Sequence, residues 1–301
     1  LEIGIENGFF IENSSGDGCV LIKAKTLSGI ISRLSDENVS ISVDENQNLA
    51  IKGSQVDFDI LGSDAQDYPV FPAIDDGFSL SLSVGELRDL IKHTIIAVSY
   101  DETKQFLNGI MIKNEQDKLL FVSTDGYRLA LKQQTIPPVN NDFNSIVPFK
   151  AVSELNRILQ GLNSDKNVEI IISENQIVFK LESFILISRL IQGQFPDYKQ
   201  VVPKESENKF LIDRQQFLAA AERAAIIATA SNNVVRFLFD NDKLEIFANA
   251  KGLGDFKEAI AIERKNENGD TVKIAFNVRL VLDVIKTLTT EKIMLEFNNE
   301  L

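Results

Sequence analysis

The stretch ENVSISVDENQNLAIKGSQVDFDIL (37–61) is matched in pattern by KNVEIIISENQIVFKLESFILISRL (166–190), 129 residues later. Both alternate apolar and polar residues, turn at Glu-Asn-Gln, and alternate again. This pattern predicts a β-hairpin followed by a further strand. A third copy begins at EKIMLEFNNEL (291–301). The chain is therefore predicted to contain repeats of one structural unit.

The segments on either side of these hairpins also recur. A helical pattern precedes each one, at 26–34, 151–162 and 278–288. An aromatic–proline element follows the first two, at 66–71 and 194–203. Each aromatic–proline element leads into an amphipathic helix with a capping signal, Ser83 to Glu86 in one and Asp213 to Gln216 in the other. Two unrelated domains can share turns by chance, but recurrence in the same order argues against that.

The predicted fold is therefore α+β, with three repeats, each of two helices packed on antiparallel sheets. We expect residues 1–75 to be the C-terminal part of a first domain, 76–203 a complete second domain, and 204–301 a third domain without its last strands. Alignment of the repeats implies about 50 residues ahead of Leu1 and about 20–30 after Leu301.

Composition narrows the functional classes. The chain has 301 residues, one Cys and a net charge of −13. A lone Cys19 excludes an internal disulfide framework and is typical of a reducing cytoplasm. Apolar runs fall short of the ~18 residues of a membrane span. The acidic balance disfavours non-specific nucleic-acid binding by the whole surface.

The charge is unevenly distributed. The five predicted helical segments together carry a net charge of about +5, which leaves about −18 for the remainder. Helices that faced a common centre would make a positive channel, able to hold a polyanion through its phosphates. The alternative is that each helix simply presents a solvated charged face.

The sequence offers no catalytic or metal-binding motif. It lacks the phosphate-binding G-x-x-x-x-G-K-[ST], the H-E-x-x-H pattern and paired cysteines. His93 is expected at the surface or boundary of an amphipathic helix, and Cys19 has no evident basic partner. FDNDKLEI (239–246) and NENGDTV (266–272) are interpreted as hairpin turns. We therefore expect no enzyme activity, cofactor or metal.

Four motifs in order carry a family resemblance: QFLNGIMI (105–112), VSTDGYRLAL (122–131), QFPDYKQVVPK (194–204) and FNVRLVLDVIKTL (276–288). With the threefold repeat, the chain resembles the bacterial sliding clamps, the beta subunits of DNA polymerase III. The resemblance implies a non-enzymatic, head-to-tail homodimeric ring around duplex DNA in the bacterial cytoplasm, without membrane contact. It also implies a clamp loader, the DNA polymerase III catalytic subunit and other proteins with clamp-binding motifs as partners.

The resemblance places a pocket for Gln-Leu-x-Leu-Phe-like peptides at the 122–131 turn. Spacing alone favours an ordinary turn with interdomain core, but the resemblance favours the pocket. Its apolar members would bury the peptide's Leu and Phe; Gly126 would allow close backbone approach, and the Arg128 guanidinium would stay in water. The residues implied are Leu107, Thr124, Gly126, Tyr127, Arg128, Leu129, Pro196, Val201, Asn277 and Leu280.

DNA contacts follow less directly from the resemblance. Lys25, Lys150 and Lys204 match basic family positions near the duplex. The loop 101–106 matches one that touches DNA, where Gln105 replaces a commonly aromatic residue and Phe106 stands beside it. The alternative function is a clamp-like protein–protein scaffold without a DNA role. The two hypotheses differ in whether the basic helix residues share one concave face.

Overall fold

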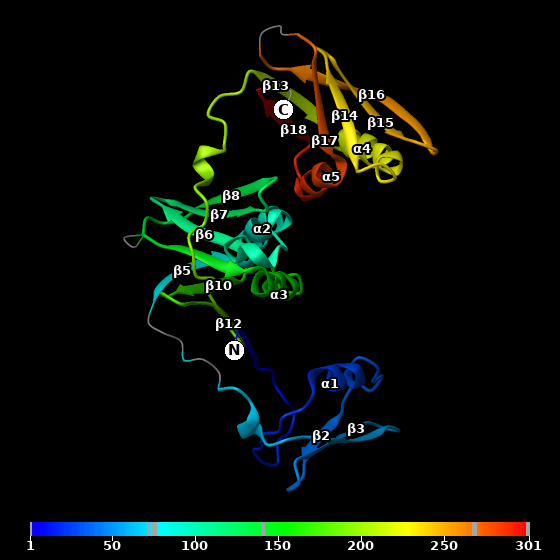
Figure 1. The fold of residues 1–301 in the computed structure, drawn as a ribbon. Helices are drawn as coiled ribbons and strands as arrows, with labels where there is room; N and C mark the ends of the chain where they lie inside the picture. Colours follow the sequence, from blue (N-terminus) through cyan, green and yellow to red (C-terminus); the bar gives the residue numbers. More distant parts are fainter. Residues whose placement is uncertain (1, 71–72, 74–76, 140–141, 267–269, 299–301) are drawn as a thin grey trace. The chain divides into compact units, whose positions relative to one another are not determined.

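The computed structural model describes residues 2–70, 73, 77–139, 142–266 and 270–298 (Figure 1). The chain divides into two compact units. Unit 1 comprises residues 1–76 and 180–187, and unit 2 comprises residues 77–179 and 188–301. The division passes through strands β11 (Gln176–Leu181) and β12 (Phe184–Arg189).

Unit 1 is built around an antiparallel three-stranded meander, β2 (Ser40–Val43), β3 (Asn48–Lys52) and β4 (Asp57–Leu61). Asp44 sets the first turn by accepting the backbone N–H groups of Asn46 and Asn48, at 2.9 and 2.8 Å. The hairpin predicted at 37–61 is therefore confirmed. The other elements of the unit are β1 (Ile3–Asn7), α1 (Ala24–Ile31) and the 3₁₀ turn η1 (Ala65–Asp67).

The first half of unit 2 contains a four-stranded antiparallel sheet in the order β8-β7-β6-β9. A second antiparallel pair is formed by β5 and β10. The bounds are β5 (Phe78–Ser83), β6 (Gly109–Glu115), β7 (Lys118–Thr124), β8 (Leu129–Thr135), β9 (Asn144–Pro148), β10 (Asn167–Ile172), α2 (Val84–Thr94), α3 (Phe149–Leu159), η2 (Ile95–Ala97), η3 (Glu102–Leu107) and η4 (Tyr198–Gln200).

Helix α2 forms where its capping signal predicts. Ser83 Oγ accepts the Glu86 N–H at 3.1 Å, and the Glu86 carboxylate accepts the Ser83 N–H at 2.8 Å, which completes the capping box. Leu87, Leu90 and Ile91 are buried, as their helical spacing predicts. The amphipathic helix expected from Ser83 onward ends at Thr94. At Thr94 the hydroxyl donates to the Leu90 carbonyl, and the chain tightens into η2.

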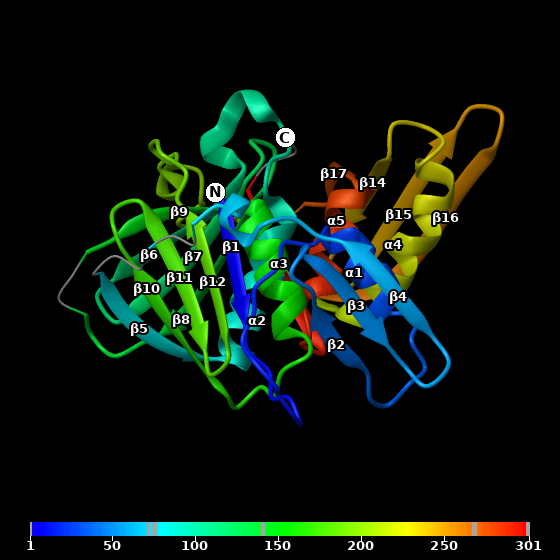
Figure 2. The same ribbon diagram turned by 90° about the horizontal axis from the view of Figure 1, so that it is seen from below.

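The second half of unit 2 contains a six-stranded sheet in the order β17-β14-β15-β16-β13-β18. Helices α4 and α5 pack against it, and α4 lies over β15 and β16 (Figure 2). The bounds are β13 (Asn208–Asp213), α4 (Arg214–Ala228), β14 (Val234–Phe239), β15 (Lys243–Ala250), β16 (Gly254–Arg264), β17 (Val272–Asn277), α5 (Val278–Thr287) and β18 (Lys292–Phe297).

Phenylalanine rings fill the core of this second half. Phe210 packs against Phe239 and Phe297 at centroid distances of 4.9 and 5.8 Å. Small alanines on α4 let the helix approach the sheet closely, because Ala220, Ala221 and Ala224 are fully buried. The turn predicted at 239–246 joins β14 to β15 and is confirmed; residues 267–269 of the other predicted turn lie outside the described residues. Among the described residues, no helix combines the length and the apolar character needed to cross a membrane.

Candidate functional site: the turn after β7

The turn between β7 and β8 is organised by Asp125. Its Oδ1 accepts the N–H groups of Tyr127 and Arg128, at 2.9 and 3.0 Å. Thr124 closes the other side: its hydroxyl donates to the Arg128 carbonyl at 2.7 Å and accepts the Gly126 N–H at 3.1 Å. Three N–H groups, those of Gly126, Tyr127 and Arg128, and the Arg128 carbonyl are thus bonded to side chains of the turn itself, which favours one shape for the turn.

Gly126 has a positive φ of +91°, in the left-handed region that glycine adopts most readily. A Cβ atom at this position would meet nothing within 4 Å. The family resemblance suggests close backbone approach as the role of Gly126. In this structure the turn requires glycine for its backbone conformation.

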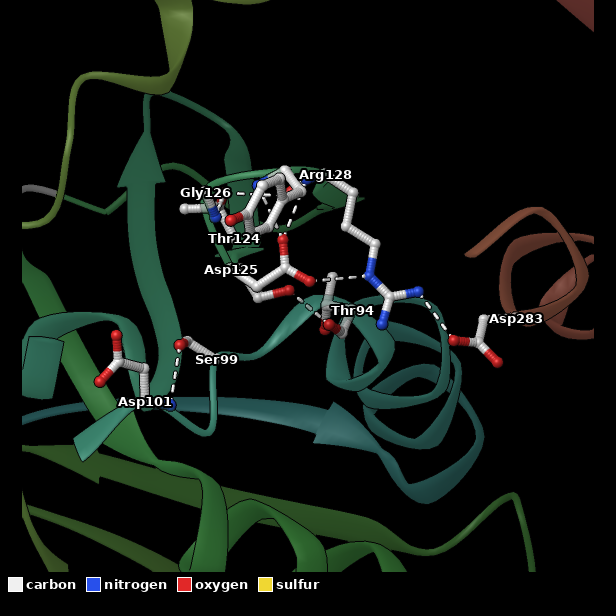
Figure 3. A network of polar contacts seen from close by, with 10 residues as sticks. Thr94, Ser99, Asp101, Thr124, Asp125, Gly126, Arg128 and Asp283 are labelled. Atoms are coloured by element: carbon white, nitrogen blue, oxygen red, sulfur yellow. Dashed lines mark hydrogen bonds and ion pairs between the residues drawn. The ribbon is translucent and has the colours of Figure 1, made fainter. Parts of the chain in front are cut away.

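The guanidinium of Arg128 lies between two carboxylates (Figure 3). Its Nε donates to Asp125 Oδ2 at 3.1 Å, and its Nη1 donates to Asp283 Oδ2 at 2.8 Å. The side chain is only 19% exposed. The guanidinium, expected to stay in water, is thus bonded to two carboxylates in this structure.

Two apolar residues of the predicted pocket lie in a small hydrophobic cluster beside the turn. Leu107 is buried in that cluster, and Leu129 packs against it from the start of β8. The cluster also holds the aromatic–proline element through Phe195 and Tyr198. Burial raises the pKa of the Tyr198 hydroxyl. The structure therefore brings Leu107 and Leu129 together, although Leu107 already serves as core.

Other residues of the predicted pocket are exposed. The Tyr127 side chain at the tip of the turn is 92% exposed, and Val201 is 68% exposed. Pro196, next to the buried Phe195, is also exposed. These apolar side chains are therefore accessible to a binding partner.

The residues predicted from the third repeat lie at the start of α5. The Asn277 side chain caps this helix by accepting the Arg279 N–H at 3.0 Å, and Leu280 is half-buried. The following backbone N–H, of Val278, donates to the Asn233 carbonyl at 2.8 Å. Asp283, which binds Arg128, belongs to the same helix.

The linker between β12 and β13 contains η4, and an ion pair made by Lys199 holds η4 in place. Lys199 Nζ donates to Glu115 Oε2 at 2.9 Å, and Lys113 donates to the other oxygen of the same carboxylate, also at 2.9 Å. The hydrogen bond from Lys199 is the main reason why the pKa of Glu115 lies below its usual 4.5. This carboxylate therefore fastens the linker to β6.

The residues predicted to contact DNA lie on helices and loops. Lys25 is exposed on α1 of unit 1, Lys150 on α3 and Lys204 in the linker after η4. Gln105 is exposed in η3, whereas Phe106 is half-buried against the apolar cluster around Leu107. Of the two η3 residues, Gln105 is thus the one presented to solvent.

Two sequence candidates for chemistry have ordinary surroundings. His93 is half-buried on α2, and its Nδ1 lies 2.8 Å from the Asp89 carbonyl oxygen. Cys19 is a free, exposed thiol in unit 1. Among the described residues, no three His, Cys, Asp or Glu side chains are grouped so that they could hold a metal ion.

Sequence reasoning missed Asp125 and Asp283. The signal for Asp125 was available, because aspartate two residues before a turn N–H commonly accepts that N–H. Asp283 gave no such signal. It lies 155 residues from Arg128, and only the fold brings the two together.

The fold matches that of one class of protein, the α+β DNA clamps. Three family models of the DNA polymerase III beta subunit match the chain in order: the N-terminal domain at residues 1–72, the central domain at 81–197 and the C-terminal domain at 199–301. The expected α+β clamp fold is confirmed.

Individual relatives of the chain, in sequence and in structure, are also sliding clamps. The beta sliding clamp of Bacillus subtilis is 31% identical over 308 residues, which cover 98% of this chain and 80% of the relative. A crystal structure of the Bacillus subtilis DNA polymerase sliding clamp has a TM-score of 0.89 at 30% identity, covering 99% of this chain and 80% of the other. The DnaN sliding clamp of Pseudomonas aeruginosa, solved with griselimycin, has a TM-score of 0.92 at 28% identity and covers 100% and 80%.

This chain belongs to the bacterial sliding clamp family, the beta subunits of DNA polymerase III. It is a DNA sliding clamp, a processivity factor of DNA replication. The alternative, a scaffold without a DNA role, is not favoured.

Proposed function

We propose that this clamp encircles duplex DNA without reading its sequence, and tethers the DNA polymerase III catalytic subunit through the turn at 124–128. The proposal rests on the residues that surround that turn. The turn is held by hydrogen bonds from its own side chains, lies beside an apolar cluster, carries exposed Tyr127, and is bonded to α5 through Arg128. A rigid polar turn next to exposed apolar side chains suits a short peptide with apolar anchors.

The partner-peptide residues of this proposal come from both halves of unit 2. We assign them the role of receiving Gln-Leu-x-Leu-Phe-like peptides from the polymerase, from a clamp loader and from other clamp-binding proteins. They are Leu107, Thr124, Gly126, Tyr127, Arg128, Leu129, Pro196, Val201, Asn277 and Leu280.

The assembly belongs to the same proposal. The chain acts without catalysis or cofactor, as part of a homodimeric ring in the bacterial cytoplasm, where the DNA that it encircles is replicated. Its domains are residues 1–75, 76–203 and 204–301, and the order of the three family matches along the chain supports this division. Lys25, Lys150, Lys204, Gln105 and Phe106 contact the DNA; exposure of the three lysines and Gln105 supports their part.

The test is a fluorescence-anisotropy titration of the whole chain with a labelled Gln-Leu-x-Leu-Phe peptide. Val201→Ser removes an apolar contact from a side chain that is 68% exposed, so the fold is expected to persist. Loss of one exposed apolar anchor is expected to weaken binding about tenfold or more.

Ile226→Ser is the matched control. Ile226 is equally exposed, at 69%, but lies on α4, which contributes no residue to the proposed site. It is expected to leave the peptide affinity unchanged. Failure of the unsubstituted chain to bind the peptide at all, or equal losses in both variants, would contradict the proposed site.

A further inference from the structure

The ion pair between Arg128 and Asp283 connects the two sides of the proposed peptide site. Arg128 ends the turn after β7, and Asp283 lies on α5, in the other half of unit 2. The two atoms that meet, Nη1 and Oδ2, are 2.8 Å apart. Figure 3 shows the guanidinium reaching from the turn to the α5 carboxylate.

The turn side of this pair is fixed by Asp125. One carboxylate oxygen holds the N–H groups of Tyr127 and Arg128, and the other holds Arg128 Nε. A guanidinium is planar and presents its donors in a rigid fork. Once Nε faces Asp125, the direction of Nη1 is set as well. Asp125 therefore aims Arg128 at α5.

The α5 side is equally fixed. Val278 and Ile285 are buried in the core of the six-stranded sheet, and Asn277 caps the helix. Leu280 precedes Asp283 by three residues, so both lie on neighbouring positions of one helical face. Where Asp283 is held, Leu280 and Asn277 are held with it.

We propose that Asp283 is a positioning residue for partner-peptide binding. By holding Arg128, it sets the spacing between the 124–128 turn and the Asn277–Leu280 end of α5 before a peptide arrives. The inference rests on the proposed function, because it assumes that these two segments receive the peptide. A preorganised site spares the peptide the cost of ordering a long side chain.

The test uses Asp283→Asn in the whole chain, titrated with the same labelled peptide. The substitution keeps the shape of the side chain and removes its charge. Binding is expected to weaken about three- to tenfold, the cost of immobilising one long side chain. The unsubstituted affinity is expected to fall with added salt more steeply than that of the variant, because salt screens a partly exposed pair.

Glu222→Gln is the matched control. Glu222 lies on α4 and forms a 3.0 Å ion pair with Lys286, which is on α5 like Asp283. This pair links α5 to α4 and not to the turn. This variant is expected to bind the peptide like the unsubstituted chain. Thermal unfolding of both variants checks that each remains folded.

Arg128→Gln separates positioning from general support of the fold. Glutamine lacks both the charge and the fork of donors that bind Arg128 to Asp125 and Asp283. If Asp283 acts through Arg128, the double variant Arg128→Gln, Asp283→Asn binds no more weakly than Arg128→Gln alone.

The outcomes distinguish the two proposals. No binding by the unsubstituted chain overturns the peptide site itself. Normal binding by Asp283→Asn, or additive losses in the double variant, overturns the role of Asp283 and leaves the peptide site standing. A non-additive loss, with Glu222→Gln unaffected, supports both.

Discussion

At the scale of single residues, the 124–128 turn depends on groups whose roles differ from those their types suggest. Asp125 is a turn residue that also orients an arginine, and Arg128 is a surface cation that is already neutralised. The Thr-Asp-Gly pattern predicts the turn, because these residues accept N–H groups and tolerate positive φ. It cannot predict the ion pair to Asp283, which depends on the packing of two distant segments.

Gly126→Ala tests the backbone requirement of this turn. Alanine in the left-handed region costs about 1–2 kcal/mol, and no neighbouring atom adds a steric term. We expect a lower unfolding midpoint and weaker peptide binding. Gly161→Ala is the control, since its Cβ would make only an ordinary 3.7 Å contact. Equal stability of the two variants would contradict this account.

At the scale of elements, alternation and capping predict the helices and hairpins but not their ends. The helix predicted at 151–162 begins at Phe149, directly after Pro148, because proline is tolerated just before the first helical turn. The helix predicted at 278–288 ends one residue early, at Thr287. Ends depend on single hydrogen bonds, such as that from Thr94 to Leu90, which no periodic pattern reveals.

The ion pair between Lys199 of the linker and Glu115 of β6 makes the stability of the protein depend on pH. Bonded to Lys199 and Lys113, the Glu115 carboxylate has a pKa below its usual 4.5 in the folded protein. A carboxyl group with a depressed folded pKa contributes stability above its unfolded pKa, and that stability is lost as the pH falls. Thermal stability is therefore expected to decline below about pH 4.5, more in the unsubstituted chain than in Glu115→Gln.

Glu102→Gln is the control for this pH series. Glu102 is exposed at the start of η3 and is expected to leave the acid dependence unchanged. If Glu115→Gln kept the same loss of stability on acidification as the unsubstituted chain, the Glu115 carboxylate would not be the group that fastens the linker.

At the scale of the whole molecule, the repeat is the feature that sequence predicts best. Each repeat must bury the same faces of its helices and strands, so the apolar positions recur with the same spacing from repeat to repeat. The predicted peptide site was less accessible to sequence. Leu107 carries the apolar character of a pocket wall, yet its side chain is buried in the core. A sequence pattern distinguishes apolar positions from polar ones, but it does not tell whether an apolar side chain lies in the core or on a contact surface.

DNA binding is also a property of the whole molecule. Removing one lysine that binds a phosphate reduces the slope of log affinity against log salt by about 1. Lys25→Ala, Lys150→Ala and Lys204→Ala together are expected to weaken binding to labelled duplex DNA and lower that slope by up to about 3. The same change at three exposed strand lysines, Lys118, Lys180 and Lys273, is the control. If both sets of substitutions reduced the slope equally, the positions of Lys25, Lys150 and Lys204 would not matter for DNA binding, and the proposed contacts would be contradicted.

The pairing of β13 with β18 has a mechanical consequence. The two strands are antiparallel, with Asn208 opposite Phe297 and Asp213 opposite Lys292. A pull on the linker before Asn208 and on the chain after Phe297 therefore acts on the same end of the ladder. The force runs along the hydrogen bonds, which then break one pair after another. Among the described residues β18 is the last strand of this sheet, and since β13 is also held by β16, β18 is the strand that peels away. Under load, β18 is expected to detach one residue pair at a time, while the rest of the sheet stays intact.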